Sequence, residues 1–198
     1  MYSSKLKSPI ADLNVKKRSL LFAELAEIAY KDKAEATKNA RSLGFTTVEY
    51  YNIDGAQAYR FMNKEDFVIA CRGTEPTEFN DIKADLNALM VDAELGGKVH
   101  RGFQTEVDDL WPTMQPAILK LGAKKTYQVD IWFCGHSLGA SMATIVASRC
   151  YEDDDCPNPQ ELYTYGSPRV GNKKYVQTLM VTHHRYQNNN DVVTRVPL

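Results

Sequence analysis

Residues 130–140 read Asp-Ile-Trp-Phe-Cys-Gly-His-Ser-Leu-Gly-Ala, and this stretch decides how the chain is organised. Its apolar first half predicts a buried strand, which runs directly into Gly135, Ser137 and Gly139. These three residues form the G-x-S-x-G pattern of a nucleophile elbow, a strained strand-to-helix turn that presents a serine hydroxyl at the end of a sheet. Glycines are required on both sides of the serine because side chains there would clash. The alternative is an ordinary glycine-rich turn with a surface serine.

The residues after the serine favour the elbow. Leu138, Met142, Ile145 and Val146 recur at helical spacing, so a helix is expected directly after the turn. Strand, turn and helix in this order are the context that the motif requires.

Composition limits the class of protein. The chain has 198 residues, which suits one domain, and a hydrophobic fraction of 43% is typical of a globular protein. With 24 basic and 25 acidic residues mixed along the chain, nothing indicates a nucleic-acid-binding face or a basic membrane patch. No apolar run is long enough to span a bilayer, and residues 1–15 lack the apolar core of a signal peptide. Localisation stays open between the cytoplasm and secretion after processing.

The cysteines and one acidic run carry no clear chemistry. Cys71 and Cys134 lie in expected central strands and are interpreted as small buried residues. Cys150 and Cys156 could close a small loop as a disulfide, although nothing in their spacing requires it, and free thiols are the expectation. The acidic run at 152–155 lacks the alternating oxygen ligands and glycine of a calcium loop, so a solvated connector is expected.

Alternating patterns along the chain predict an α/β fold. A first amphipathic helix is expected from about Arg18, followed by three strands that begin the sheet in antiparallel fashion and by alternating helices and strands in the second half. Such alternation predicts a largely parallel sheet with helices on its faces. The expected strands are 46–51, 56–61, 66–71, 127–134, 161–165 and 184–188, and the later helices are 105–121, about 138–149 and 171–180.

A further short amphipathic helix is expected beside the elbow. Phe79, Ile82, Leu86 and Leu89 line one face of it at spacings of three and four residues. Two interpretations stay open: the helix covers the core, or it is a lid whose apolar face shields an acyl pocket.

Five separated motifs resemble the class 3 (fungal-type) lipase family of α/β-hydrolases, over roughly residues 20–198. They are Cys-Arg-Gly-Thr at 71–74, His-Arg-Gly-Phe at 100–103, Gly-His-Ser-Leu-Gly-Ala at 135–140, Tyr-Gly-Ser-Pro-Arg-Val-Gly-Asn at 165–172 and Asn-Asp-Val-Val-Thr-Arg-Val-Pro at 190–197. The resemblance implies an α/β-hydrolase fold in one domain over residues 1–198, with a mixed, mostly parallel central sheet and helices on both faces.

The resemblance also implies a catalytic site that needs no metal or organic cofactor. Ser137 is then the nucleophile, and Asp191 is the acid that orients its base. Without the resemblance, Asp191 is equally well explained as an Asx turn after a strand. The backbone N–H of Leu138 and the loop residue Thr74 are the expected oxyanion donors, and Asp85 is expected to brace the oxyanion loop or to be a surface charge.

The base is the point at which the sequence departs from the family. In the family the catalytic histidine follows the acid by tens of residues, whereas the sequence given ends at Leu198. His136 lies inside the elbow and is expected to point away from the nucleophile, and His100 is expected to pack under the oxyanion loop. His183 and His184 are expected to precede the last strand, at the wrong end of the sheet. None is assigned as the base, so the expectation is a domain without its C-terminal part, or one that has lost its base.

The sequence therefore predicts a carboxylic ester hydrolase, with a triacylglycerol lipase acting on acylglycerols, at a lipid–water interface if the lid exists, as the first hypothesis. Fold does not fix substrate, so a short-chain or hydroxycinnamoyl esterase or a phospholipase is the alternative within enzymes. A catalytically inactive hydrolase-like domain that binds lipid or a partner is the alternative from another class.

Overall fold

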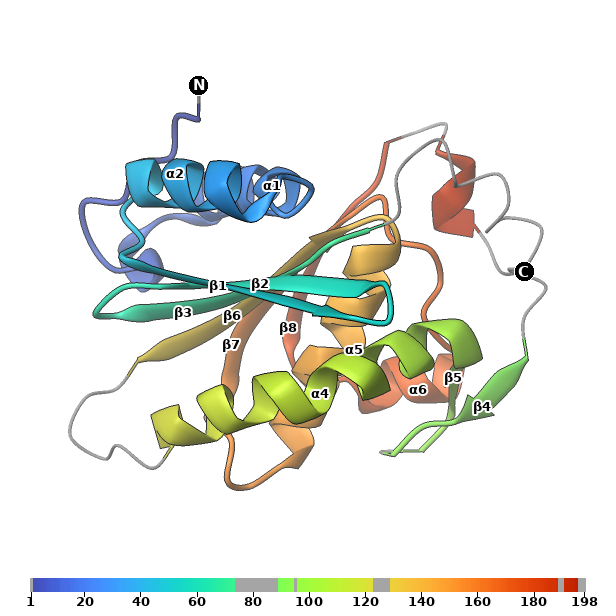
Figure 1. Cartoon of the computed structure of the whole chain (residues 1–198). Coiled ribbons are helices and arrows are strands. Elements are labelled where there is room, and N and C mark those ends of the chain that lie inside the picture. The colour runs from blue at the N-terminus through green and yellow to red at the C-terminus, as the bar shows by residue number, and fades with distance from the viewer. Residues whose placement is uncertain (1, 74–88, 95, 123–128, 189–190, 196–198) are drawn as a thin grey trace.

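A computed structural model describes residues 2–73, 89–94, 96–122, 129–188 and 191–195 of the chain (Figure 1). Its centre is a six-stranded sheet with the strand order β1-β2-β3-β6-β7-β8. The strands of this sheet are β1 (Thr47–Ile53), β2 (Ala56–Met62), β3 (Asp66–Cys71), β6 (Asp130–His136), β7 (Pro159–Tyr165) and β8 (Thr182–Tyr186). A separate hairpin consists of β4 (Met90–Asp92) and β5 (Lys98–His100).

The sheet is mixed and mostly parallel, as the sequence predicts. β1, β2 and β3 are antiparallel to one another, and β3, β6, β7 and β8 are parallel. In the parallel part, Ile69 lies opposite Phe133, and Phe133 lies opposite Leu162. All six residues of β3 are buried, which is the pattern of a central strand covered on both faces.

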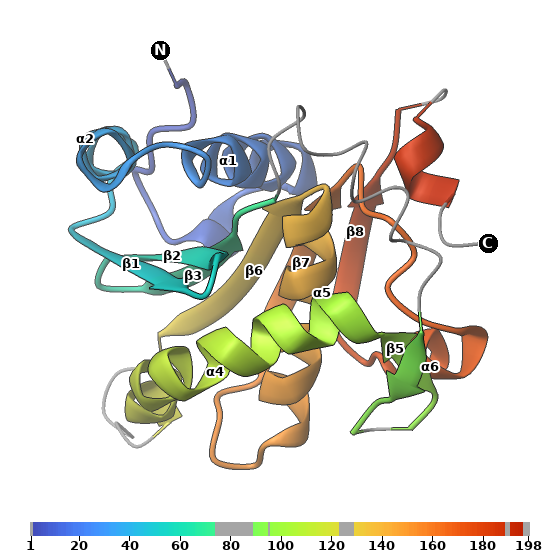
Figure 2. The same cartoon turned by 45° about the vertical axis from the view of Figure 1, so that its right-hand side comes forward.

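Helices cover both faces of the sheet (Figures 1 and 2). They are α1 (Val15–Ile28), α2 (Lys33–Leu43), α4 (Arg101–Gly122), α5 (Leu138–Glu152) and α6 (Lys173–Thr178), with short 3-10 helices at Ile10–Asp12 and Val192–Arg195. α1 and α2 lie on one face and α4, α5 and α6 on the other. Two hydrophobic cores result, because side chains alternate between the faces of each strand. Within the described residues, no helix combines the length and the apolar character needed to cross a membrane.

The two N-terminal helices begin and end on local signals. The side chain of Asn14 accepts a hydrogen bond from Lys17 N and begins α1, and Asp32 accepts from Glu35 N and begins α2. α2 ends at Gly44, whose φ of 110° is a conformation that favours glycine. These caps define where each of the two helices begins and where α2 ends.

Several predicted elements require correction. The first helix begins at Val15, before Arg18, and α2 and the hairpin β4–β5 were not predicted. The last strand is β8 at Thr182–Tyr186, whereas 184–188 was expected, so His183 and His184 lie within it and do not precede it. The strand predicted at 66–71 has the expected bounds, and the remaining predicted strands and helices are present with one or both ends shifted, although 127 and 128 lie outside the described residues. The expected lid helix also lies outside them, except for Leu89.

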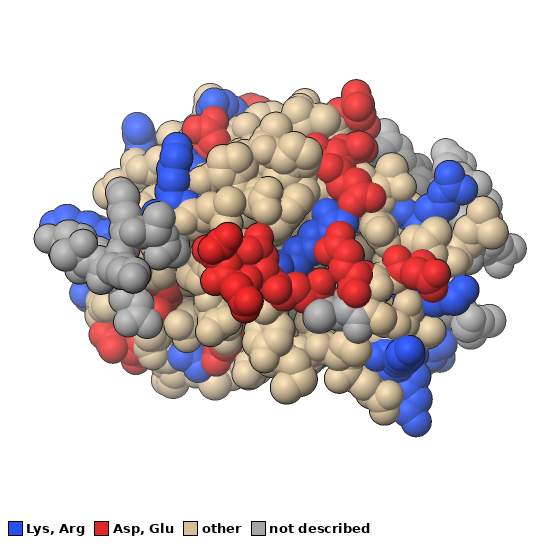
Figure 3. All heavy atoms as spheres, turned by 90° about the horizontal axis from the view of Figure 1, so that it is seen from below, with Lys and Arg blue, Asp and Glu red and all other residues tan. Residues whose placement is uncertain are grey.

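The acidic run at 152–155 ends α5 and turns into a loop. It lies on the face viewed in Figure 3, where acidic side chains gather around basic ones. The buried Arg149 in α5 forms ion pairs there with Asp108 and Glu94. All four cysteines are buried free thiols, Cys150 and Cys156 included, in line with the expectation.

Candidate active site

The carboxyl ends of the parallel strands meet at one edge of the sheet. His136 at the end of β6 lies opposite Tyr165 at the end of β7, and Tyr165 lies opposite Tyr186 at the end of β8. Cys71, the last residue of β3, lies opposite Gly135. The residues that follow these strands therefore gather at this edge, which is where open α/β sheets bind ligands.

The elbow is strained in the way its sequence predicts. Ser137 has φ 55° and ψ −127°, a region that L-residues rarely occupy. Its N–H donates to Tyr165 O at 2.9 Å, and α5 begins at the next residue, Leu138. The backbone is thus held by β7 on one side and by a helix N-terminus on the other.

Close backbone contacts explain both glycines of the motif. A Cβ added at Gly135 would lie 2.3 Å from Gly139 O, and a Cβ added at Gly139 would lie 2.3 Å from Cys71 O. Because these neighbours are backbone atoms of buried elements, neither contact can be relieved by a side-chain movement. The steric argument made from the sequence is confirmed.

Asp191 forms the expected Asx turn and also lies close to His136. Its Oδ1 accepts a hydrogen bond from Val193 N at 3.0 Å, which is the expected Asx turn. Its Oδ2 lies over Gly166, 3.1 Å from where a Cβ of that residue would be. The same position lies 3.6 Å from Nε2 of His136, so the carboxylate and the imidazole flank Gly166 together.

Sequence reasoning missed Tyr30, which comes to this edge from the residues after α1. Its hydroxyl lies 2.9 Å from Nδ1 of His136 and 3.5 Å from the carbonyl oxygen of the same residue. A Cβ at Gly73, in the loop after β3, would lie 2.3 Å from the Tyr30 hydroxyl. One signal was available: alternation along β6 places His136 on the same face as Trp132 and Cys134, which is the α1 face.

The other histidines are not at the elbow. His100 is buried, its Nδ1 accepts from Gly102 N at 3.1 Å, and its ring stacks on Phe103 at 4.1 Å. Within the described part of the chain, no histidine or carboxylate is hydrogen-bonded to the Ser137 hydroxyl. Thr74 and Asp85, expected at the oxyanion loop, lie outside the described residues.

Comparison with known proteins identifies the family. Residues 68–198 match the family described as lipase (class 3). The chain belongs to the class 3 lipase family. It is 31% identical over 194 residues to the toxin TseL of Vibrio cholerae, covering 76% of this chain and 29% of that protein. It is 30% identical over 139 residues to the secreted mono- and diacylglycerol lipase 1 of Fusarium solani, covering 68% of this chain and 40% of that protein.

The fold is that of solved fungal lipases. The structure of the Rhizomucor miehei triacylglyceride lipase superposes with a TM-score of 0.78 at 20% identity, covering 93% of this chain and 76% of that chain. The chain spans less than half the length of the two relatives named above. Tyr30 precedes the segment that matches the lipase family, so the candidate site includes a residue from outside that segment.

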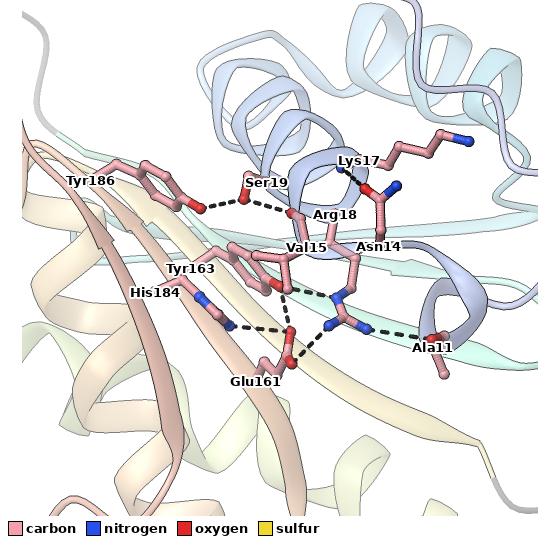
Figure 4. A network of polar contacts seen from close by, with 10 residues as sticks. All are labelled: Ala11, Asn14, Val15, Lys17, Arg18, Ser19, Glu161, Tyr163, His184 and Tyr186. Atoms are coloured by element: carbon pink, nitrogen blue, oxygen red, sulfur yellow. Dashed lines mark hydrogen bonds and ion pairs between the residues drawn. The ribbon is translucent and has the colours of Figure 1, made fainter.

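A second polar group in this lipase domain lies away from the elbow, between α1 and the last two strands of the sheet, β7 and β8 (Figure 4). It comprises Arg18, Glu161, Tyr163 and His184, here called the strand cluster. Arg18 Nη2 lies 3.1 Å from one oxygen of Glu161, and the Tyr163 hydroxyl donates to the other. His184 Nε2 lies 3.6 Å from that second oxygen, and its ring stacks on Tyr163. Burial raises the pKa of Tyr163, so its hydroxyl stays protonated and donates.

Proposed function

We propose that this domain hydrolyses carboxylic esters by acyl transfer through Ser137, with acylglycerols as the substrate class. The observation that carries the proposal is the strained Ser137 at the carboxyl edge of the sheet, directly before α5. A serine held at positive φ between two obligatory glycines costs stability and is maintained where the strain serves function. Membership of the class 3 lipase family and the acylglycerol named for the Fusarium relative support the substrate class.

The proposed chemistry needs four further groups besides the nucleophile: a base, two oxyanion donors and an acid. A base removes the Ser137 proton as Oγ attacks the ester carbonyl, and the resulting oxyanion needs N–H donors. Leu138 is the proposed donor within the described residues, because it is the first residue of α5 and its N–H belongs to the free first turn of that helix. Thr74 is proposed as the second donor. Asp191 is the proposed acid, since its carboxylate stands at the same edge as Ser137.

The proposal is tested by serine reactivity and by hydrolysis. The protein is incubated with a fluorophosphonate and mapped by mass spectrometry, and turnover is measured on soluble p-nitrophenyl butyrate and on an emulsified triacylglycerol. We expect an adduct on Ser137 and hydrolysis of both esters. Ser137→Ala should lose about 10⁴-fold or more in kcat and should form no adduct. Ser141→Ala is the matched control, because Ser141 is a buried serine of the same helix.

The outcomes separate the rival functions. Hydrolysis of the soluble ester alone would favour a short-chain or hydroxycinnamoyl esterase. No adduct and no turnover, with Ser137→Ala and the unchanged protein equally stable, would overturn the proposal in favour of a binding domain. Replacing each of His100, His136, His183 and His184 singly by alanine tests the base. A loss of about 10⁴-fold for one of them would identify it as the base within residues 1–198.

A further inference from the structure

The end of α1 brings a phenol to the elbow. Tyr30 follows the helix and is held in its turn by a hydrogen bond from its N–H to Glu27 O at 3.1 Å. Its hydroxyl contacts both Nδ1 and the carbonyl oxygen of His136, the residue before the nucleophile. The Arg72 guanidinium lies 5.8 Å from the centre of the Tyr30 ring. Tyr30 thus lies between the loop after β3 and the elbow.

The helix that directly precedes Tyr30 is fixed to the sheet, so the phenol is presented at a defined place. Four apolar side chains of α1 are fully buried, namely Leu21, Phe22, Leu25 and Ile28. Phe22 stacks on Tyr163 of β7 with ring centroids 4.4 Å apart. A side chain held by a packed helix loses little further freedom when it forms a hydrogen bond, which favours a positioning role.

The imidazole of His136 has Tyr30 at one ring nitrogen and Asp191 near the other. Nδ1 faces the phenol, and Nε2 lies on the side of Gly166 where Asp191 Oδ2 is found. Gly166 has φ 57°, a left-handed conformation, and any Cβ there would intrude between the two side chains. The absence of that Cβ lets the carboxylate and the imidazole lie near each other.

The protonation state of His136 suits this arrangement. Burial lowers the pKa of His136, and the carboxylate of Asp191 opposes this decrease without cancelling it. The ring is therefore neutral at pH 7, with one nitrogen that donates and one that accepts. If the Tyr30 hydroxyl donates to Nδ1, the hydrogen of the ring is on Nε2, where Asp191 is the available acceptor.

We propose that Tyr30 and His136 are positioning residues, with the phenol donating to Nδ1 of His136 and the Nε2–H of His136 orienting the carboxylate of Asp191. The catalytic consequence rests on the proposed function, because Asp191 is the proposed acid. The hydrogen-bond chain itself is independent of that function. A residue from the turn after the N-terminal helix, outside the part that matches the lipase family, thereby fixes the geometry of the elbow.

The proposed hydrogen bonds from Tyr30 through His136 to Asp191 are tested first by nitrogen-15 NMR of the histidine side chains. This measurement identifies the protonated nitrogen and the pKa of each ring. The His136 signals are assigned with His136→Gln. We expect His136 to carry its hydrogen on Nε2. In Tyr30→Phe the pKa of His136 should rise by about 0.5 or more, because a hydrogen bond to the neutral ring is lost. In Asp191→Asn it should fall, because a neighbouring negative charge is removed.

Tyr59→Phe is the matched control. The Tyr59 hydroxyl donates to Lys31 O at 2.9 Å, so its removal disturbs the same turn without touching His136. Tyr59→Phe should leave the His136 titration unchanged. A hydrogen on Nδ1 of His136 in the unchanged protein, or equal shifts in Tyr30→Phe and Tyr59→Phe, would overturn the proposal.

Steady-state kinetics test the second part of the proposal, namely that Tyr30 and His136 position Asp191 for catalysis. On soluble p-nitrophenyl butyrate, Tyr30→Phe should lower kcat about 10-fold with KM nearly unchanged, and Tyr59→Phe should lower neither. An unchanged kcat in Tyr30→Phe would overturn the positioning role. If the unchanged protein hydrolyses no ester, the proposed function fails, and the NMR result still decides whether the hydrogen-bond chain exists.

Discussion

Two polar clusters join α1 to the sheet, and they contain similar groups in different settings. The elbow cluster consists of Tyr30, His136, Ser137 and Asp191, and the strand cluster consists of Arg18, Glu161, Tyr163 and His184. Each combines a phenol, an imidazole and a carboxylate with a contact from α1 or from the turn after it. Residue types alone therefore do not distinguish an active site from a structural contact.

Charge balance is the first difference between the clusters. Glu161 has an arginine 3.1 Å away and a phenol hydrogen bond, so its charge is balanced by a fixed cation and a hydrogen-bond donor. The side chain of Asp191 accepts a hydrogen bond from a backbone N–H, and the neutral imidazole of His136 lies nearby across Gly166. A carboxylate whose partners are neutral keeps capacity to stabilise a positive charge that forms during a reaction.

Position on the strands is the second difference. Glu161, Tyr163 and His184 lie within β7 and β8, where α1 covers them (Figure 4). The elbow cluster lies at the strand ends, where the backbone leaves the sheet after His136 and helix N–H groups become available. The two clusters contain similar side chains, so the position at the carboxyl edge of the sheet is what distinguishes the candidate site from the strand cluster.

The largest expected effect separates the two carboxylates by activity. Asp191→Asn should lower kcat for ester hydrolysis about 10⁴-fold, because the acid that orients the base loses its charge. Glu161→Gln should leave kcat within about threefold. Both are measured with p-nitrophenyl butyrate under the same conditions. Equal losses in the two variants would show that the comparison between the clusters is wrong.

The next effect sharpens the comparison at β8, where His184 belongs to the strand cluster and its neighbour His183 lies on the other face beside Thr164. Burial, Arg185 and His184 lower the pKa of His183 to about 4. As pH falls, His183 is therefore protonated in the unfolded chain before it is protonated in the folded protein. The stability that is present above pH 6.5 should be lost as pH falls towards 4.

The loss attributable to His183 should be on the order of 3 kcal/mol, from the size of the pKa change. The free energy of unfolding is measured in urea at pH 7 and at pH 4.5. Compared with the unchanged protein, His183→Gln should lose less stability between the two values. A parallel dependence in both proteins would show that His183 is not the group responsible.

A smaller effect tests the ion pair of the strand cluster. Glu161→Gln should lower the free energy of unfolding by about 2 kcal/mol, since Arg18 is left half-buried without its charged partner. Arg18→Met combined with Glu161→Gln should recover part of the loss. Urea denaturation of both single variants and the double variant gives the coupling. Additive losses would contradict a direct interaction.

The smallest effect lies at the rim of the strand cluster, where the half-exposed Tyr186 hydroxyl contacts Ser19 of α1. Tyr186→Phe should lower the free energy of unfolding by about 0.5 kcal/mol, because water replaces an exposed partner at little cost. Ester hydrolysis should not change. A loss of activity would place Tyr186, the last residue of β8, in the site.

Much of the fold was predictable because it follows from short-range patterns. The run of six buried residues in β3 and the helical spacing after Ser137 depend on local periodicity. α2 was missed because its mean hydropathy is low and it buries only Ala36, Ala40 and Leu43, a sparse apolar stripe. β8 was misplaced because its residues are half-buried or exposed and show no clear alternation.

The sequence by itself determined the elbow: the order of glycine, serine and glycine between an apolar strand and a helix admits few other structures, because backbone contacts forbid side chains on both sides of Ser137. Only the tertiary structure decided which residues from other parts of the chain contact the elbow. Tyr30 is far from His136 in the chain, and their contact exists because α1 packs across β6 and β7. The same packing makes Glu161 a partner of Arg18, because the separation between residues along a chain does not specify which strands a helix will cover.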